Sequence, residues 1–185
     1  MGRLSASSVR AFVSSFVVTG RLLWQGRLRL VDELVDRHIE FADGGRFRVY
    51  RETVCLAPNR APCVLVVRFR LRLVGRRALL HALFRAESLA NTPLFAGFPG
   101  FRTKLWMTDE RTGEYRGLYD WDGPERARAY ATTLVALLRL VCVPGSVAFH
   151  IEPHVERDDY LRRVALAESG TPPQGWWAPA QSASA

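Results

Sequence analysis

The segment from Phe98 to Tyr130 is the most informative part of the chain and reads FPGFRTKLWMTDERTGEYRGLYDWDGPERARAY. Thr103–Thr108 and Glu114–Trp121 are rich in aromatic and β-favouring residues, which is typical of strands. The polar residues between them end in Gly113, which can adopt the positive φ that a hairpin loop requires. The segment therefore predicts two antiparallel neighbouring strands.

A helix is expected directly after this hairpin. Asp122 occupies the position of an N-cap, and Glu125 lies three residues further on, as in a capping box. Pro124 falls in the first turn, where a missing N–H costs nothing. The helix should therefore begin near Gly123.

The flanking sequence extends this hairpin and helix to a β-α-β-β-α-β order. Alternating apolar residues predict a strand over Val64–Leu73, and a leucine pattern predicts a helix over Arg76–Leu89. Asn91–Gly100 contains too many Pro and Gly residues for a helix and should form an irregular loop. Val147–Glu152 is the expected last strand. The sequence thus predicts an α+β domain.

Four short motifs resemble the YdhR-like mono-oxygenases of the dimeric α/β-barrel superfamily: Pro-Gly-Phe-x-x-Lys-x-Trp from Pro99, a Thr-Gly hairpin, Gly-x-Tyr-x-Trp from Gly117, and Ala-x-x-Tyr from Ala127. The resemblance covers about residues 61–153 and implies a ferredoxin-like subunit whose sheet packs against a partner's sheet. Known members include cofactor-free quinol oxygenases, haem-degrading enzymes and pure binding proteins. Even this fold therefore leaves the chemistry open.

The segments outside the resemblance divide the chain into three parts: an N-terminal extension (1–56), the ferredoxin-like domain (57–154) and a C-terminal tail (155–185), which should contain a short helix and be partly disordered. The extension should contain an amphipathic helix with Val13, Phe16 and Trp24 on its apolar side, and a hairpin of His38–Phe41 with Arg46–Thr53. We expect the helix to pack on its own core or on a dimer mate rather than on a membrane surface. The adjacent tryptophans Trp176 and Trp177 should dock on the chain itself or its mate.

Both faces of the central hairpin carry large apolar side chains. Alternation along the strands predicts one face with Leu105, Met107, Tyr119 and Trp121 and another with Trp106 and Leu118. A sheet that is apolar on both faces needs two covers. Helices can supply one and a second subunit the other, which predicts a homodimer independently of the resemblance.

Composition argues against several classes of protein. The net charge is +8, but Lys104 is the only lysine, and the arginines are spread along the chain without a nucleic-acid-binding motif. We therefore expect no nucleic-acid partner. Cys55, Cys63 and Cys142 show no metal-ligand spacing and should be buried thiols, although a Cys55–Cys63 disulfide is an alternative. No targeting signal is clear, and a cytoplasmic protein is the default expectation.

No hydrolase, kinase, dehydrogenase or metalloprotease motif is present, and no metal site is expected. The remaining candidates form an aromatic pocket with a few polar groups, as in small-molecule sites. We assign possible catalytic roles to His150, Asn91 and Arg116, and possible substrate contacts to Trp106, Tyr119, Tyr130, His81 and Arg68. Core packing is the competing interpretation for the three aromatic residues, and a structural hydrogen bond for His150.

Three functions fit these residues. The first is an oxidoreductase resembling the cofactor-independent mono-oxygenases, which would hold a small aromatic or polycyclic hydrophobic substrate as an enolate or phenolate that reduces dioxygen directly. The second is a non-catalytic dimeric binding or accessory protein for an apolar metabolite. The third is haem binding, with His81 or His150 as axial ligand.

Overall fold

A computed structural model describes residues 6–72, 92–162 and 175–180. The predicted helix over Arg76–Leu89 lies outside these ranges. The described elements, in chain order, are α1 (Ala6–Trp24), β1 (Leu28–Val31), β2 (His38–Phe41), β3 (Arg46–Cys55), β4 (Pro62–Arg70), η1 (Thr92–Leu94), β5 (Phe101–Asp109), β6 (Glu114–Asp122), α3 (Pro124–Val141), β7 (Ala148–Pro153), α4 (Arg157–Arg162) and β8 (Pro179–Ala180).

The centre of the molecule is a ferredoxin-like sheet. Four strands lie in the order β7-β4-β6-β5, and each neighbouring pair is antiparallel. The first and last of these strands in the chain, β4 and β7, are therefore neighbours, and α3 connects β6 to β7, as in the split β-α-β arrangement. The predicted ferredoxin-like α+β fold is confirmed.

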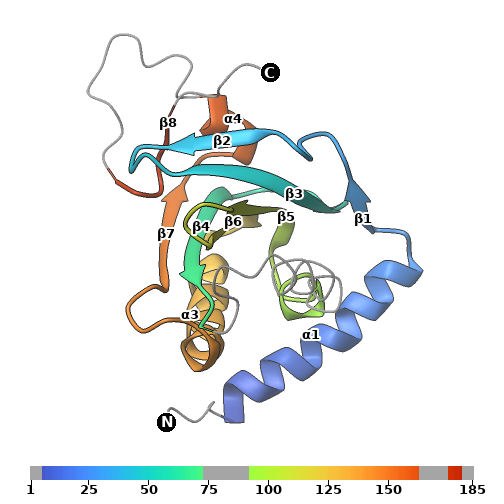
Figure 1. Ribbon diagram of the computed structural model, residues 1–185. Coiled ribbons are helices and arrows are strands. Elements are labelled where there is room, and N and C mark those ends of the chain that lie inside the picture. Colours follow the sequence, from blue (N-terminus) through green and yellow to red (C-terminus); the bar gives the residue numbers. More distant parts are fainter. Residues whose placement is uncertain (1–5, 73–91, 163–174, 181–185) are drawn as a thin grey trace.

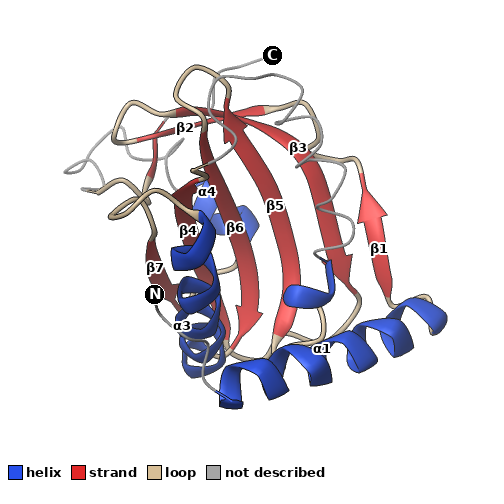
Figure 2. Ribbon diagram, turned by 60° about the horizontal axis from the view of Figure 1, so that its bottom comes forward, coloured by secondary structure: helices blue, strands red, loops and turns tan. Residues whose placement is uncertain are grey.

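The N-terminal segment continues the same sheet. Strand β3 pairs with β5, β2 pairs with β3, and the short C-terminal strand β8 pairs with β2, while β1 also pairs with β3. The predicted hairpin of β2 and β3 is confirmed. Figure 2 shows the resulting curled sheet with α1 running beneath the ends of its strands.

The register of the central hairpin differs from the expectation. Leu105 lies opposite Leu118, and Trp106 lies opposite Gly117. The predicted sharing of a face by Leu105, Met107, Tyr119 and Trp121 is therefore wrong, because the alternation within each strand was right but the pairing between strands was shifted by one residue. Trp106 instead shares a face with Tyr119 and Trp121.

These two faces have different covers. We call the first the helix face, because α3 and the loop after η1 pack on it; it carries Cys63, Leu65, Val67, Trp106, Tyr119 and Trp121. We call the second the tail face; it carries Val64, Val66, Leu105, Met107 and Leu118. In Figure 1, α3 lies below the central strands, and α4 with β8 lies above them.

The tail face is covered by the chain itself. Val155 and Tyr160 are buried against it, and Trp176 and Trp177 pack on the same cluster. The two tryptophans therefore dock within their own chain, which is one of the two outcomes expected. The second cover predicted for this sheet is therefore supplied by α4 and the tail of the same chain, and the homodimer stays a prediction.

The start of α3 is also built differently from the prediction. Gly123, with φ of 105°, is the N-cap, and no side chain caps the helix. The Asp122 carboxylate instead accepts hydrogen bonds from the backbone N–H groups of Arg60 and Ala61, at 3.0 Å each. It also pairs with Arg102 and Arg126. Asp122 therefore ties the linker before β4 to the end of β6.

Candidate ligand site on the helix face

A cluster of aromatic residues surrounds Lys104 at the centre of the helix face. Lys104 lies opposite Tyr119 in the β5–β6 pairing, and Trp106 lies opposite Gly117. The Tyr119 ring folds over Gly117, where a Cβ atom would lie 2.6 Å from a ring carbon. Glycine at this position therefore makes room for two large rings beside the lysine.

The Lys104 ammonium group contacts ring faces. Its Nζ lies 3.0 Å from the ring centroid of Trp106, 4.4 Å from that of Phe95 and 4.8 Å from that of Tyr119. The residue is only 6% exposed. Within the described part of the chain, no carboxylate lies within salt-bridge distance of it. Lys104 is therefore a buried amine among aromatic rings.

Two opposing effects act on the protonation of Lys104. The ring faces favour the ammonium form by about 2 kcal/mol at a desolvated site. Burial of an unpaired charge costs several kcal/mol, and the nearby positive charge of Arg51 adds to that cost. The larger effect is burial, so the pKa of Lys104 lies well below its usual range. An amine that is neutral in a buried site can act as a base.

Two tyrosines continue the cluster toward α3. The Tyr130 hydroxyl lies 3.4 Å from the Tyr119 hydroxyl, and the two rings meet edge to face. Burial raises the pKa of both phenols above the ordinary value. Both side chains therefore stay protonated at neutral pH and can donate hydrogen bonds, but they provide no anion to pair with Lys104.

The edges of the cluster contain further polar groups. The Trp106 Nε1–H donates to Thr53 Oγ1 at 3.3 Å, which fixes the indole ring that faces Lys104. The Trp121 Nε1 atom is buried and finds no acceptor among the described residues. The Trp121 and Tyr130 rings are tilted by 30° to each other, and their centroids are 4.8 Å apart. A buried N–H group without an acceptor can donate a hydrogen bond to an oxygen atom of a ligand.

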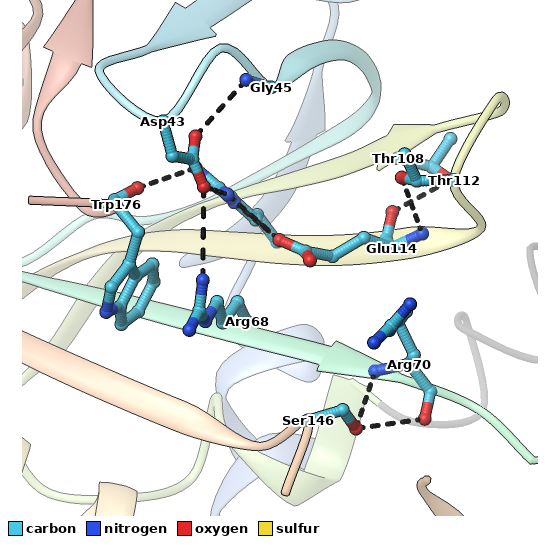
Figure 3. A network of polar contacts seen from close by, with 10 residues as sticks. Asp43, Gly45, Arg68, Arg70, Thr108, Thr112, Glu114, Ser146 and Trp176 are labelled. Carbon is cyan, nitrogen blue, oxygen red and sulfur yellow. Dashed lines mark hydrogen bonds and ion pairs between the residues drawn. The ribbon is translucent and has the colours of Figure 1, made fainter.

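Arg116 and Arg68 lie on the opposite side of the sheet. Arg116 is buried on the tail face, where its guanidinium pairs with Asp43 and Glu114 and donates to the Trp176 carbonyl oxygen at 2.7 Å. The Arg68 Nη1 atom lies 3.9 Å from Asp43 Oδ2, and its Cζ atom lies 4.5 Å from the Trp176 ring centroid. Figure 3 shows Asp43 between the Gly45 N–H and the Arg68 guanidinium. This network holds the tail against the sheet.

His150 also belongs to the tail face. Its ring stacks on Trp177 with centroids 4.1 Å apart, and its Nε2 atom lies 3.2 Å from Glu152 Oε2. The ring is thus held by one tail residue and one strand neighbour. The role of His150 as an axial haem ligand stays a prediction.

The predicted site residues therefore separate into three groups. Trp106, Tyr119 and Tyr130 meet on the helix face, whereas Arg68, Arg116 and His150 meet on the tail face. His81 and Asn91 lie outside the described residues. Lys104 is not among the site residues predicted from the sequence, although its being the only lysine was a signal that could have pointed to it.

Surface hollows occur elsewhere on the molecule. One of about 470 Å³ lies over the start of β3 and the β5–β6 turn and is lined mainly by polar and charged residues, among them Arg48 and Glu110. Another of about 570 Å³ lies beside Asn59 and Arg102. The polar lining of the first hollow does not suit an apolar ligand. The second hollow is lined largely by apolar residues, among them Val54, Leu56 and Pro58.

Within residues 6–72, 92–162 and 175–180, His, Cys, Asp and Glu side chains form no group of three that could hold a metal ion. In the same ranges, no helix is long and apolar enough to span a bilayer. All three cysteines are buried free thiols, as expected.

Comparison with known proteins gives remote structural neighbours. No family model matches the chain, and no curated protein matches it. The YdhR-like family therefore stays a prediction. An uncharacterized ferredoxin-fold protein related to antibiotic biosynthesis monooxygenases, from Listeria monocytogenes, aligns with a TM-score of 0.43 and 14% identity over 61% of this chain and 66% of that chain.

Two further solved structures align to a similar extent. A monooxygenase-like protein from Listeria innocua gives a TM-score of 0.40 and 14% identity over 63% of this chain and 69% of its own. A heme-degrading enzyme from Listeria monocytogenes gives a TM-score of 0.42 and 10% identity over 64% of this chain and 84% of its own. The fold assignment made above rests on the strand order itself.

Proposed function

We propose that the helix face binds a small aromatic or polycyclic hydrophobic substrate and that the protein is a cofactor-independent, mono-oxygenase-like oxidoreductase. The observation that carries this proposal is Lys104, a buried amine with lowered pKa whose Nζ faces three aromatic rings. Such a site suits a flat, apolar molecule that carries one acidic proton, such as a phenol or the enol form of an aryl ketone.

Lys104 is the proposed general base. The neutral amine removes the acidic proton of the substrate, and the resulting ammonium group pairs with the phenolate or enolate. The electron-rich anion then reduces dioxygen. In the balanced reaction, a substrate CH₂ group and O₂ give a C=O group and water, so the carbon loses two hydrogens and gains one oxygen atom. The second oxygen atom leaves in the water molecule.

The aromatic residues of the cluster have distinct parts in this proposal. Trp106 and Phe95 provide surfaces on which a flat ring stacks. Tyr119 and Tyr130 stay protonated and can donate hydrogen bonds to a substrate oxygen. Trp121 Nε1, which lacks an acceptor among the described residues, is a further possible donor. In this proposal Arg116, Arg68 and His150 act on the fold by holding the tail.

Lys104→Met is the decisive variant. It keeps the length and most of the volume of the side chain but removes the base. We expect the wild-type protein to consume oxygen with a phenolic or anthrone-type substrate. The rate of oxygen consumption by Lys104→Met should be lower by a factor of at least about one hundred, because general base catalysis contributes about 10²–10⁴-fold. Thr103→Val is the matched control, because Thr103 precedes Lys104 on β5 and faces the other way.

A spectroscopic measurement separates binding from chemistry. A bound phenolate absorbs at longer wavelength than the phenol, so the wild-type complex should show the anion spectrum and the Lys104→Met complex the neutral one. A phenolate spectrum in the variant would show that Lys104 is not the base. Substrate binding without oxygen uptake by the wild-type protein would instead support the second function, a non-catalytic binding or accessory protein.

The homodimer expected from the resemblance stays part of the proposal. The buried tail face leaves little of the central sheet for a partner, because Val64, Val66, Leu105, Met107 and Leu118 are already covered. A dimer must therefore use another surface or displace the tail. Native mass spectrometry of the full chain measures the oligomeric state, and a monomer at micromolar concentration would remove the dimer from the proposal.

A further inference from the structure

Helix α1 contacts the rest of the protein through the small polar residues Ser15 and Thr19 and through the partly buried Leu22. Ser15 and Thr19 are both about 1% exposed, and the Ser15 hydroxyl donates to the Pro93 carbonyl oxygen. A Cβ atom on Gly97 would lie 2.0 Å from the Ser15 carbonyl oxygen. Glycine therefore allows α1 to lie directly against the loop after η1. The polar side of this helix faces the protein.

The apolar side of α1 faces solvent. Val17 is 72% exposed and Trp24 is 88% exposed. The other exposed apolar residues follow at helical spacings of three and four and include Val13, Phe16 and Leu23. Of the two covers expected for this stripe, the core of its own chain is therefore excluded for these residues, and packing on a dimer mate stays a prediction. Figure 2 shows α1 along the margin of the molecule.

The first 31 residues of the chain carry charge of one sign. The first acidic residue of the chain is Asp32, whereas Arg3, Arg10, Arg21, Arg27 and Arg29 all precede it. Arg10 and Arg21 are exposed and, by the helical periodicity, flank the apolar stripe on one side. An exposed apolar helix surface with arginines at its border is the pattern of helices that lie in the headgroup region of an anionic bilayer.

We propose that α1 attaches the protein to an anionic lipid surface, with Val13, Phe16, Val17, Leu23 and Trp24 inserted among the acyl chains and Arg10 and Arg21 on the headgroups. The helix lies in the plane of the interface and does not cross the bilayer. Trp24, at the C-terminal end of α1, suits the interface because its ring is apolar and its N–H remains hydrated. This inference stands apart from the chemistry proposed for Lys104.

Charge also decides between a membrane and a second copy of the chain. Two copies paired through α1 would bring two sets of arginines together, and residues 1–31 contain no carboxylate to neutralise them. Like charges placed together oppose association. An anionic bilayer provides both the apolar interior and the negative charge that this surface lacks.

Vesicle flotation of the full chain tests the proposal. We expect binding to phosphatidylcholine vesicles that contain phosphatidylglycerol, much weaker binding to pure phosphatidylcholine, and loss of binding at high salt. Trp24 is highly exposed in the free protein, so its emission should shift to shorter wavelength and be quenched by brominated lipid. A Trp24→Phe variant identifies that signal.

Matched variants separate the apolar and the charged contributions. Phe16→Ser with Val17→Ser should weaken binding by about tenfold or more. Leu140→Ser with Val141→Ser, which replaces exposed apolar residues of α3, should leave binding unchanged. Arg21→Gln should weaken binding about fivefold, since each basic residue near an anionic surface contributes about 1 kcal/mol. Arg128→Gln, on the exposed side of α3, is its control.

Three results would overturn the proposal. The first is an absence of binding to anionic vesicles at low salt while the protein keeps its folded circular dichroism spectrum. The second is an equal loss of binding in the α3 control variants. The third is self-association in the absence of lipid that Phe16→Ser with Val17→Ser abolishes, which would identify α1 as an interface between copies.

Discussion

The Arg157 Nη1–H donates to Glu52 Oε1 at 2.6 Å, and both side chains are almost completely buried. Arg157 begins α4, and Glu52 lies in β3 of the N-terminal segment. The same Glu52 accepts a hydrogen bond from the Leu34 N–H at 3.2 Å. One buried ion pair therefore joins the N-terminal segment to the C-terminal segment on the tail face.

Arg157→Met should destabilise the fold by about 3–5 kcal/mol, because it leaves the Glu52 carboxylate buried without its partner. Chemical denaturation measures this loss as a lower midpoint. The double variant Arg157→Met with Glu52→Gln should recover much of the stability, since no buried charge remains. A double variant that is less stable than Arg157→Met alone would contradict this account.

Lys104→Met should make the protein more stable at neutral pH. In the folded chain Lys104 has a pKa well below the ordinary lysine value of 10.5. At a pH between the lowered pKa of the folded chain and the ordinary pKa of the unfolded chain, Lys104 is protonated only in the unfolded chain. The free energy of unfolding of the wild-type protein therefore rises with pH in this range. The advantage of the variant should therefore shrink as pH increases toward 10.5, where the unfolded lysine also loses its proton.

Denaturation of both proteins at several pH values measures this difference. A stability gap that stays constant from neutral to alkaline pH would show that Lys104 is charged in the folded protein. The same result would remove the proposed base.

Gly117→Ala should disturb the aromatic cluster. The new methyl group would lie 2.6 Å from a carbon of the Tyr119 ring, so the ring must move. Overpacking of this kind costs about 1–3 kcal/mol. Denaturation gives the cost, and near-ultraviolet circular dichroism reports the change in the aromatic environment. An unchanged aromatic spectrum would show that the Tyr119 ring has another position.

The three cysteines should resist alkylation in the folded protein. Burial raises the pKa of Cys63 to about 12 and that of Cys142 to about 11, and burial also raises the pKa of Cys55. A thiol reacts as its thiolate, so labelling by iodoacetamide near neutral pH should require unfolding. Mass spectrometry with and without denaturant measures this. Rapid labelling of the native chain would contradict the burial of these thiols.

Local patterns in the sequence predicted most of the strands and helices that the structure describes. The β5–β6 hairpin, the β2–β3 hairpin and α3 follow from residues near one another in the chain, whereas the ferredoxin-like arrangement of the central strands was implied by the family resemblance. Alternation also separated Trp106 from Leu105 within one strand. These features depend on period, turn residues and apolar content, which a linear sequence records directly.

The candidate site could be predicted only in part. Trp106, Tyr119 and Tyr130 were named from their chemistry, but the pairing register decides which side chains share a face, and a shift of one residue exchanges them. That register brings Lys104 among the rings and places Arg116 and His150 on the opposite side. Burial of Lys104 depends on the same packing, so the lowered pKa of Lys104 could not be predicted from the sequence.

The sequence by itself determined the identity, order and approximate ends of most of the secondary-structure elements that the structure describes, since these depend on interactions between near neighbours. Only the tertiary structure decided how they are covered. The tail closes one sheet face through Arg157, Trp176 and Trp177, and α1 turns Ser15 inward and Trp24 outward. The physical reason is that burial depends on the contacts a segment makes with distant residues, whereas periodicity shows only that two sides of a helix or strand differ.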